Sequence, residues 1–160
     1  MATEKLSCVM PAGAPNKDER AQRPRPLHLR AHHLLWLHGF RGLGYSNEFA
    51  ANMRRIKQRL EQDSPMVRMH VGPDTICRAC PHLATRAECS RPGGTDRDRA
   101  VVAALEIEPG TVKPWPWWVR QVRARIGPQR LAEICADCSW FPLGYCQAGI
   151  ERLHEHREGG

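Results

Sequence analysis

Residues 76–89 read ICRACPHLATRAEC, and residues 134–146 read ICADCSWFPLGYC. Each stretch contains a C-x2-C pair, preceded by isoleucine and followed, after eight or seven intervening residues, by a third cysteine. A C-x2-C turn places two sulfurs close enough to bind one metal ion or neighbouring irons. The six cysteines of the two stretches, which we predict to be ligands, are Cys77, Cys80, Cys89, Cys135, Cys138 and Cys146. Two such turns in one chain predict a metal or iron–sulfur centre around which a small fold is organised.

Length and composition indicate one ordinary globular domain. The chain has 160 residues, of which 41% are hydrophobic and 26% are charged, so we expect a single core. No apolar run approaches the roughly 18 residues that a membrane span needs, and the N-terminal residues lack the apolar stretch of a secretory signal. We therefore expect a cytoplasmic protein that does not associate with membranes. Thiols stay reduced in that compartment, which favours metal ligation over disulfides.

Proline, glycine and charged residues mark the ends of the predicted domain. Residues 1–26 contain four prolines and no sustained apolar period, which predicts a disordered tail that includes the seventh cysteine, Cys8. Residues 27–150 form the cysteine-rich metal-binding or iron–sulfur-binding domain, and residues 151–160 form a charged C-terminal tail. We expect an α+β fold that is mainly helical. It is a single small domain with two C-x2-C metal-binding turns and at most a short sheet.

Apolar spacing predicts the individual helices and strands. The segment 27–37 is apolar enough for a short buried helix that ends at Gly39, with a strand allowed before it. Ser46 is a good N-cap for an amphipathic helix over 47–62. We further expect a half-buried strand over 67–71, a helix capped by Thr95 or Asp96, a helix within 113–126, and a short helix from Gln129 that leads into the second cysteine pair.

Three arrangements of the cysteines fit their spacing. One cluster takes four of the six thiolates, or two sites each take three thiolates and a fourth ligand, or a structural zinc leaves two cysteines idle. For the first half of the candidate site, residues 76–89, His82 is the candidate fourth ligand, since it follows Cys80 by two residues. Trp140 holds the equivalent position of the second half and cannot bind metal. This asymmetry favours a single joint site, or one complete site beside an incomplete one.

The chemistry of the centre follows from the number of thiols. Sulfur-rich sites suit both zinc and iron–sulfur clusters such as the 4Fe–4S type. A strict zinc ribbon needs only the two C-x2-C pairs and leaves Cys89 and Cys146 without a role. We therefore expect an iron–sulfur cluster that serves electron transfer or redox sensing. A zinc-stabilised interaction module is the alternative, and a metalloenzyme with an open coordination position is a third reading.

The order of motifs in this chain resembles one protein family. The segments LRAHHLL (29–35), GFRGLGYS (39–46) and ICRACPH (76–82), together with the second cysteine stretch, look like the DUF1284 family, small prokaryotic proteins of unknown function proposed to bind iron–sulfur. The resemblance covers about residues 27–150. It implies a cluster bound by the six cysteines, and it implies no activity. Members commonly carry cysteine where this chain has Trp36.

Histidines and arginines are the other candidates for a functional role. His32 and His33 are adjacent on a predicted helix and point about 100° apart, so we expect at most one of them to serve as a ligand or in proton transfer. The net charge of +7 comes mostly from arginine. It fits a solvated surface, an acidic partner such as a redox protein, or nucleic acid. Arginines near the cysteines, such as Arg78, Arg86 and Arg130, are expected to offset thiolate charge.

Overall fold

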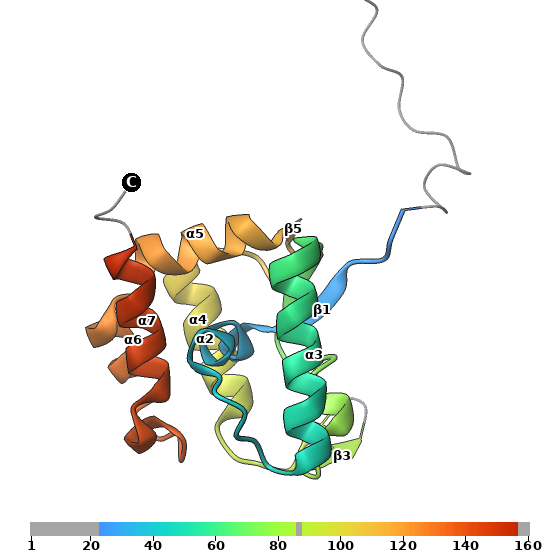
Figure 1. Cartoon of the computed structure of the whole chain (residues 1–160). Helices are drawn as coiled ribbons and strands as arrows, with labels where there is room; N and C mark the ends of the chain where they lie inside the picture. Colours follow the sequence, from blue (N-terminus) through green and yellow to red (C-terminus); the bar gives the residue numbers. More distant parts are fainter. Residues whose placement is uncertain (1–22, 86–87, 157–160) are drawn as a thin grey trace, which may run out of the picture.

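A central helix, α2 (Ala31–Gly39), is surrounded by the other helices (Figure 1). Six of its nine residues are buried, and a helix that is apolar on most sides belongs in a core rather than on a surface. The computed structural model describes residues 23–85 and 88–156. Of the predicted N-terminal tail, residues 1–22, including Cys8, lie outside the described residues.

A three-stranded sheet lies next to α2. Strand β1 (Leu27–Arg30) runs parallel to β2 (Met66–His70), and β5 (Val112–Pro114) pairs antiparallel with β2, which gives the strand order β1-β2-β5. Leu27 and Leu29 of β1 are buried, as are Val67 and Met69 of β2. The sheet therefore contributes alternate apolar side chains to the core.

Five further helices complete the core. They are α3 (Asn47–Asp63), α4 (Gly94–Leu105), α5 (Trp115–Arg125), α6 (Pro128–Ile134) and α7 (Tyr145–Glu155). Helix α2 packs against α7 and α4, and α5 crosses one end of the bundle (Figure 1). Trp118 of α5 is fully buried, and its indole N–H donates to the carbonyl oxygen of Val67 at 3.2 Å. This bond ties α5 to the sheet.

The two helix starts that we predicted from capping residues have different outcomes. Ser46 caps α3 as expected, since its hydroxyl accepts the N–H of Phe49 at 3.1 Å. The prediction of Thr95 or Asp96 as the cap of α4 was wrong, because this helix begins at Gly94 after Gly93. Gly93 has φ +78°, and a Cβ there would lie 2.8 Å from Asp137 Oδ2. A left-handed glycine thus turns the chain into the helix earlier than a side-chain cap would.

The mainly helical α+β fold in a single small domain is confirmed. The short strand β5 and the hairpin of β3 (Leu83–Thr85) and β4 (Glu88–Cys89) are additions to the predicted elements. Helix α7 continues to Glu155, beyond the boundary that we drew at residue 150. None of the helices within residues 23–85 and 88–156 has the length and apolarity that a bilayer span requires.

Two glycines allow α2 and α7 to approach at backbone distance. A Cβ on Gly149 would lie 2.3 Å from the carbonyl oxygen of His38, and a Cβ on Gly39 would lie 2.5 Å from the carbonyl oxygen of Tyr145. No side chain fits at either position without moving one helix. The contact matters for the candidate site, because α7 also carries Cys146.

Gly149→Ala is expected to reduce the free energy of unfolding by about 3 kcal/mol, since the methyl group must push α7 away from α2 in a close-packed core. Urea denaturation followed by circular dichroism measures the change. Gly127→Ala is the matched control, because nothing lies within 4 Å of a Cβ at Gly127 and its φ is −86°. Equal losses in the two variants would contradict the role assigned to the helix contact.

Candidate metal site

The first C-x2-C pair forms a tight turn followed by a hairpin. The turn is the 3-10 helix η1 (Cys77–Ala79), and the N–H of Cys80 donates to the carbonyl oxygen of Cys77 at 2.9 Å. Strands β3 and β4 then return the chain, so that Cys89 pairs with Leu83. Burial raises the pKa of the Cys80 thiol, and the nearby Cys89 thiol raises it further by a smaller amount. A hydrogen bond from the His82 N–H to the Cys80 sulfur acts in the opposite direction. Cys80 and Cys89 therefore form one pair of interacting thiols.

The second C-x2-C pair joins α6 to α7. Cys135 follows the end of α6, and the N–H of Cys138 donates to the Cys135 carbonyl oxygen at 3.0 Å. The 3-10 helix η2 (Phe141–Leu143) then leads into α7, which carries Cys146 near its start. Burial and the thiols of Cys138 and Cys146 raise the pKa of Cys135 to about 12. Burial and Cys138 raise the pKa of Cys146 to about 11. The three thiols of this half form one interacting group.

Tyr45 contacts residues of both cysteine stretches. Its ring meets His82, two residues after Cys80, edge-on at 4.8 Å between centroids, and it meets Trp140, two residues after Cys138, at 5.4 Å. Burial raises the pKa of the Tyr45 hydroxyl, and the thiols of Cys138 and Cys80 both add to this effect. The residues two positions after the second cysteine of each turn therefore contact the same tyrosine, from segments that are far apart in the sequence.

Trp36 extends this contact into the core. Its ring stacks on Phe49 at 5.4 Å and lies 5.4 Å from Trp140 and 5.7 Å from Tyr45. The position at which the resembling family commonly has cysteine therefore lies beside the second C-x2-C turn. In this chain a large aromatic side chain occupies that position and packs between the turn and α3.

Two arginines other than the predicted ones act on the cysteines. Arg91 acts on Cys80 and Arg97 on Cys135, and in each case the positive charge partly opposes the rise in the thiol pKa. Arg91 also covers the Tyr45 ring at 4.8 Å and donates to the Ser139 hydroxyl at 2.7 Å.

Of the predicted arginines, Arg78 is exposed, Arg130 pairs with Glu133 at 3.1 Å, and Arg86 lies outside the described residues. Arg91 stands two residues after Cys89 in the sequence, whereas Arg97 reaches Cys135 only through the tertiary fold.

Cys77 lies in a different environment from the other cysteines. His33, Asp74 and Cys77 are all buried, and each offers a ligand atom within 4.8 Å of the other two. Within residues 23–85 and 88–156 this is the only group of three or more histidines, cysteines or acidic residues at that spacing. It combines two predicted ligands, His33 and Cys77, with Asp74, and it is a candidate for metal binding.

Asp74 is ionised at neutral pH. Burial opposes its ionisation, but the facing His33 ring at 3.0 Å, together with the backbone N–H groups of Arg30 and Cys77 at 2.9 Å each, lowers the pKa of Asp74 to about 2. Burial and the Asp74 carboxylate raise the pKa of the Cys77 thiol. The group therefore contains an ionised Asp74 carboxylate, held by hydrogen bonds, beside a protonated Cys77 thiol.

A second buried carboxylate, Asp98, organises the residues around this group. Oδ2 of Asp98 accepts from Arg30 Nε at 2.9 Å and Nη2 at 2.7 Å, and from the Gly72 N–H at 2.9 Å. Its Oδ1 accepts from the N–H of His32 at 3.0 Å and lies 2.6 Å from Nδ1 of the same residue. Burial lowers the pKa of His32 to about 4 despite this carboxylate. Asp98 thus holds the start of α2 in place.

The structure brings some of the predicted ligands together and separates others. Apart from the group at Cys77, no three thiol or imidazole ligand atoms of the described residues lie within 4.8 Å of one another. His82 contacts Cys80 through its backbone N–H and Tyr45 through its ring. His32 and His33 have ring centroids 4.6 Å apart, yet they pair with different aspartates, as their angular separation on a helix requires.

Sequence reasoning missed Asp74, Asp98 and Tyr45. The burial of Asp98 could have been predicted from the sequence. It precedes Val101 by three residues and Leu105 by seven, which places it on the buried stripe of α4. Asp74 stands three residues before Cys77 at the end of a Gly-Pro turn, a position from which a carboxylate can cap the next turn. Nothing in the local pattern of Tyr45 distinguishes it from a core aromatic residue.

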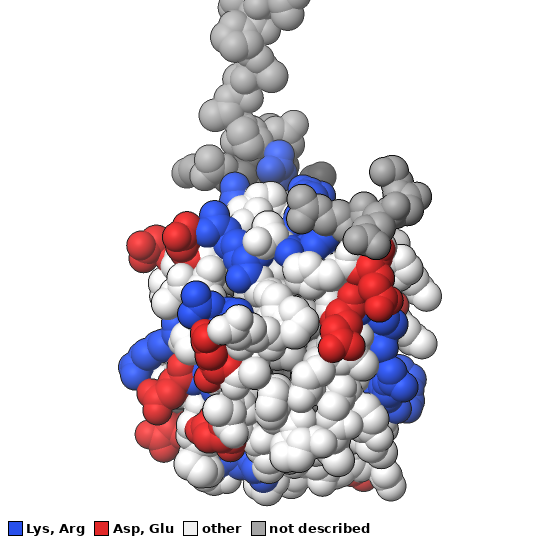
Figure 2. Space-filling model, turned by 90° about the vertical axis from the view of Figure 1, so that its left-hand side faces the viewer, with Lys and Arg blue, Asp and Glu red and all other residues white. Residues whose placement is uncertain are grey.

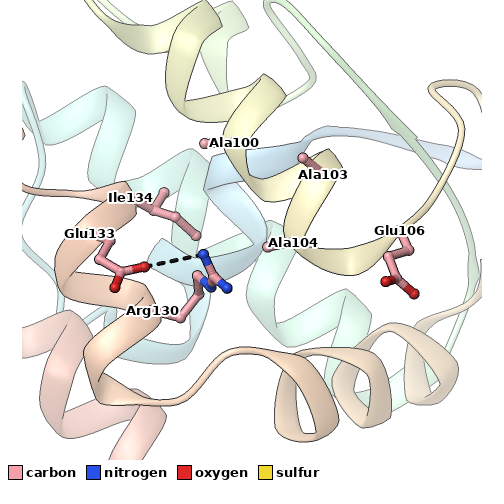
Figure 3. A pocket seen from close by; sticks show the side chains of 7 residues that line it. All are labelled: Ala100, Ala103, Ala104, Glu106, Arg130, Glu133 and Ile134. Carbon is pink, nitrogen blue, oxygen red and sulfur yellow. Dashed lines mark hydrogen bonds and ion pairs between the residues drawn. The ribbon is translucent and has the colours of Figure 1, made fainter.

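A surface pocket of about 420 Å³ lies near the second turn (Figure 3). Three alanines of α4 form one wall, and Ile134, one residue before Cys135, forms part of the other. The Arg130 and Glu133 side chains, both from α6, also line the pocket and form an ion pair with each other. The pocket contains no cysteine or histidine, so it is not the candidate metal site.

Charge is unevenly distributed on the face that Figure 2 shows. Lysine and arginine side chains gather toward its upper end, and much of the lower part carries no charged side chain. The two cysteine turns lie toward the lower end of the molecule in Figure 1. On this face, positive charge therefore gathers toward the end opposite the cysteine turns.

Comparison with known proteins places the chain in one family. A family model described as a protein of unknown function, DUF1284, matches residues 44–144, and the chain belongs to this family. The matched range includes Tyr45 and both C-x2-C pairs, which confirms the resemblance that the motifs indicated. No curated protein and no solved structure matches the chain.

Proposed function

We propose that this protein binds an iron–sulfur cluster through cysteines from both C-x2-C pairs and acts in electron transfer or redox sensing in a reducing compartment such as the cytoplasm. The observation that carries the proposal is the meeting of the two turns at Tyr45. Cys80 and Cys138 act on the same hydroxyl group, and His82 and Trp140 contact the same ring. Two segments whose cysteines are 45 residues apart at their nearest, Cys89 and Cys135, would have little reason to converge there if the thiols were unrelated.

The donor set fits such a cluster. Cys80 and Cys89 interact on one side of Tyr45, and the three thiols of the second half interact on the other. Iron–sulfur clusters are bound by cysteine thiolates, and four are sufficient. Burial keeps several of these thiols protonated in the chain alone, and a cation is what compensates the cost of ionising them together. When bound, the cluster would supply a one-electron redox couple.

The surrounding residues would tune this centre. Arg91 and Arg97 place positive charge beside Cys80 and Cys135, which stabilises thiolates and favours the more reduced state of a bound cluster. The rings of Trp36, Tyr45 and Trp140 cover the space between the turns and limit the access of water. The weakly charged part of the nearby surface is where we place contact with a redox partner protein.

Anaerobic purification tests the proposal. We expect brown protein that contains iron and acid-labile sulfide, with visible absorbance that bleaches on exposure to oxygen. Colourless protein that contains zinc in place of iron, and no sulfide after reconstitution with iron and sulfide, would reject the iron–sulfur centre. That second result would support the zinc-stabilised module instead.

A further inference from the structure

The first C-x2-C turn directs its two sulfurs to different places. The residues that act on the Cys80 thiol include Cys89 and Arg91. Those that act on Cys77 are Asp74 and Arg30, and Arg30 Nη1 lies 3.9 Å from the Cys77 sulfur. Cys77 is 4% exposed, whereas Cys80 is only partly buried. The two thiols of this turn therefore have different surroundings.

We propose that His33, Asp74 and Cys77 form a separate mononuclear site for a zinc ion. The proposal goes beyond the iron–sulfur function and does not depend on it. Imidazole nitrogen, carboxylate oxygen and thiolate sulfur are the three kinds of ligand that zinc accepts in proteins. Calcium and magnesium prefer oxygen alone, and an iron–sulfur cluster needs more than one thiolate.

The geometry of the group is close to that of a coordination shell. Zinc–ligand bonds of 2.0–2.3 Å in a tetrahedron separate neighbouring ligand atoms by about 3.3 Å or slightly more. His33 Nδ1 and Asp74 Oδ2 are 3.0 Å apart, and one ligand atom from each of the three side chains lies within 4.8 Å of the other two. Shifts of a few tenths of an ångström to about one ångström bring all three atoms onto one ion. The His33 ring proton then resides on Nε2, and the Cys77 thiol proton is released.

The supporting hydrogen bonds already orient the ligands. Asp74 Oδ1 accepts the Cys77 N–H, and Oδ2 accepts the Arg30 N–H, so the carboxylate is held by backbone on both sides. Outer-shell bonds of this kind position the ligands of metal sites. Each ligand comes from a different segment: α2, the turn after β2, and η1. An ion at this point would therefore connect the central helix to the first cysteine turn.

The balance of charge around the three residues also favours binding of a cation. Arg30 and Asp98 are buried and pair with each other at 2.7 Å, so their charges cancel. The carboxylate of Asp74 and a Cys77 thiolate together carry two negative charges, which a divalent ion neutralises. Buried charge without such compensation is costly.

Metal analysis of the full-length protein and two kinds of variant tests the proposal. We expect Asp74→Asn and His33→Gln to lose one equivalent of zinc and to keep iron and sulfide. We expect Cys138→Ser to lose iron and sulfide and to keep this zinc. Asp137→Asn, which changes an exposed aspartate between the cysteines of the other turn, is the matched control and should retain both. Circular dichroism establishes that each variant folds.

X-ray absorption at the zinc edge of the unmodified protein provides a test that needs no variant. The proposal expects one sulfur and at least two nitrogen or oxygen neighbours around zinc. Three or four sulfur neighbours would overturn it, as would full zinc retention by folded Asp74→Asn. Loss of iron and sulfide from Cys77→Ser, with zinc unchanged, would show that Cys77 serves the cluster. In that case the separate site fails while the iron–sulfur proposal stands.

Discussion

Cys138→Ser is expected to remove almost all iron and acid-labile sulfide from protein purified without oxygen. Cys138 interacts with two other thiols of its half and faces Tyr45. Serine has nearly the same size, but its hydroxyl is a much poorer ligand for iron than a thiolate. Cys80→Ser is expected to have the same effect, because a shared centre needs both turns. Iron and sulfide assays, with visible absorbance, measure the outcome.

Cys8→Ser is the control for these variants, since Cys8 belongs to neither C-x2-C stretch. It should leave the iron and sulfide content unchanged. Loss of the centre in Cys138→Ser with full retention in Cys80→Ser would place the cluster in the second half alone. Retention in both variants would mean that the meeting of the turns at Tyr45 does not reflect metal binding.

Asp98→Ala is expected to lower the free energy of unfolding by about 4 kcal/mol, the range for breaking a buried ion pair. Asp98 is fully buried, and its carboxylate accepts hydrogen bonds from Arg30, His32 and the Gly72 backbone. Alanine leaves the Arg30 guanidinium in the core without its partner, and an unpaired buried charge is far less favourable than a hydrated one. Urea denaturation at neutral pH measures this loss.

Asp96→Ala, on the same helix, is the matched control. Asp96 is largely exposed, and its contact with Arg99 at 3.7 Å is a surface ion pair, for which we expect a loss below about 1 kcal/mol. Similar losses in the two variants would contradict the structural role of Asp98. A loss in Asp98→Ala that is accompanied by disorder of the start of α2, measured by hydrogen exchange, would support it further.

Local patterns predicted most helices well because each is specified by residues within a few turns. The 3.6-residue spacing of apolar side chains and the hydroxyl of Ser46 were enough to locate α3. The same approach missed β5, which has three residues and pairs with β2 through contacts distant in sequence. It also misplaced the start of α4, because Gly93 adopts a left-handed conformation and begins the helix without a side-chain cap.

The candidate ligands show the same division. Cysteine spacing identified two C-x2-C turns without any knowledge of the fold. That spacing could not show that Cys77 lies with Asp74 and His33, or that His82, two residues after Cys80, contacts Tyr45. Among the arginines, Arg130 pairs with Glu133, and two that the sequence did not single out act on the thiols: Arg91, which follows β4, and Arg97 of α4. Side-chain direction and long-range neighbours depend on how the elements pack.

The amino-acid sequence by itself determined the two C-x2-C turns, the family, and a small, mainly helical domain, because short-range spacing specifies turns and helices. Only the tertiary structure decided that the turns meet at Tyr45, that Asp98 neutralises Arg30, and which sulfur faces which group. The contacts at Tyr45 and between Arg30 and Asp98 join residues 37 to 95 positions apart in the chain. Their free energy comes from burial and charge pairing in the assembled core, which no local segment contains.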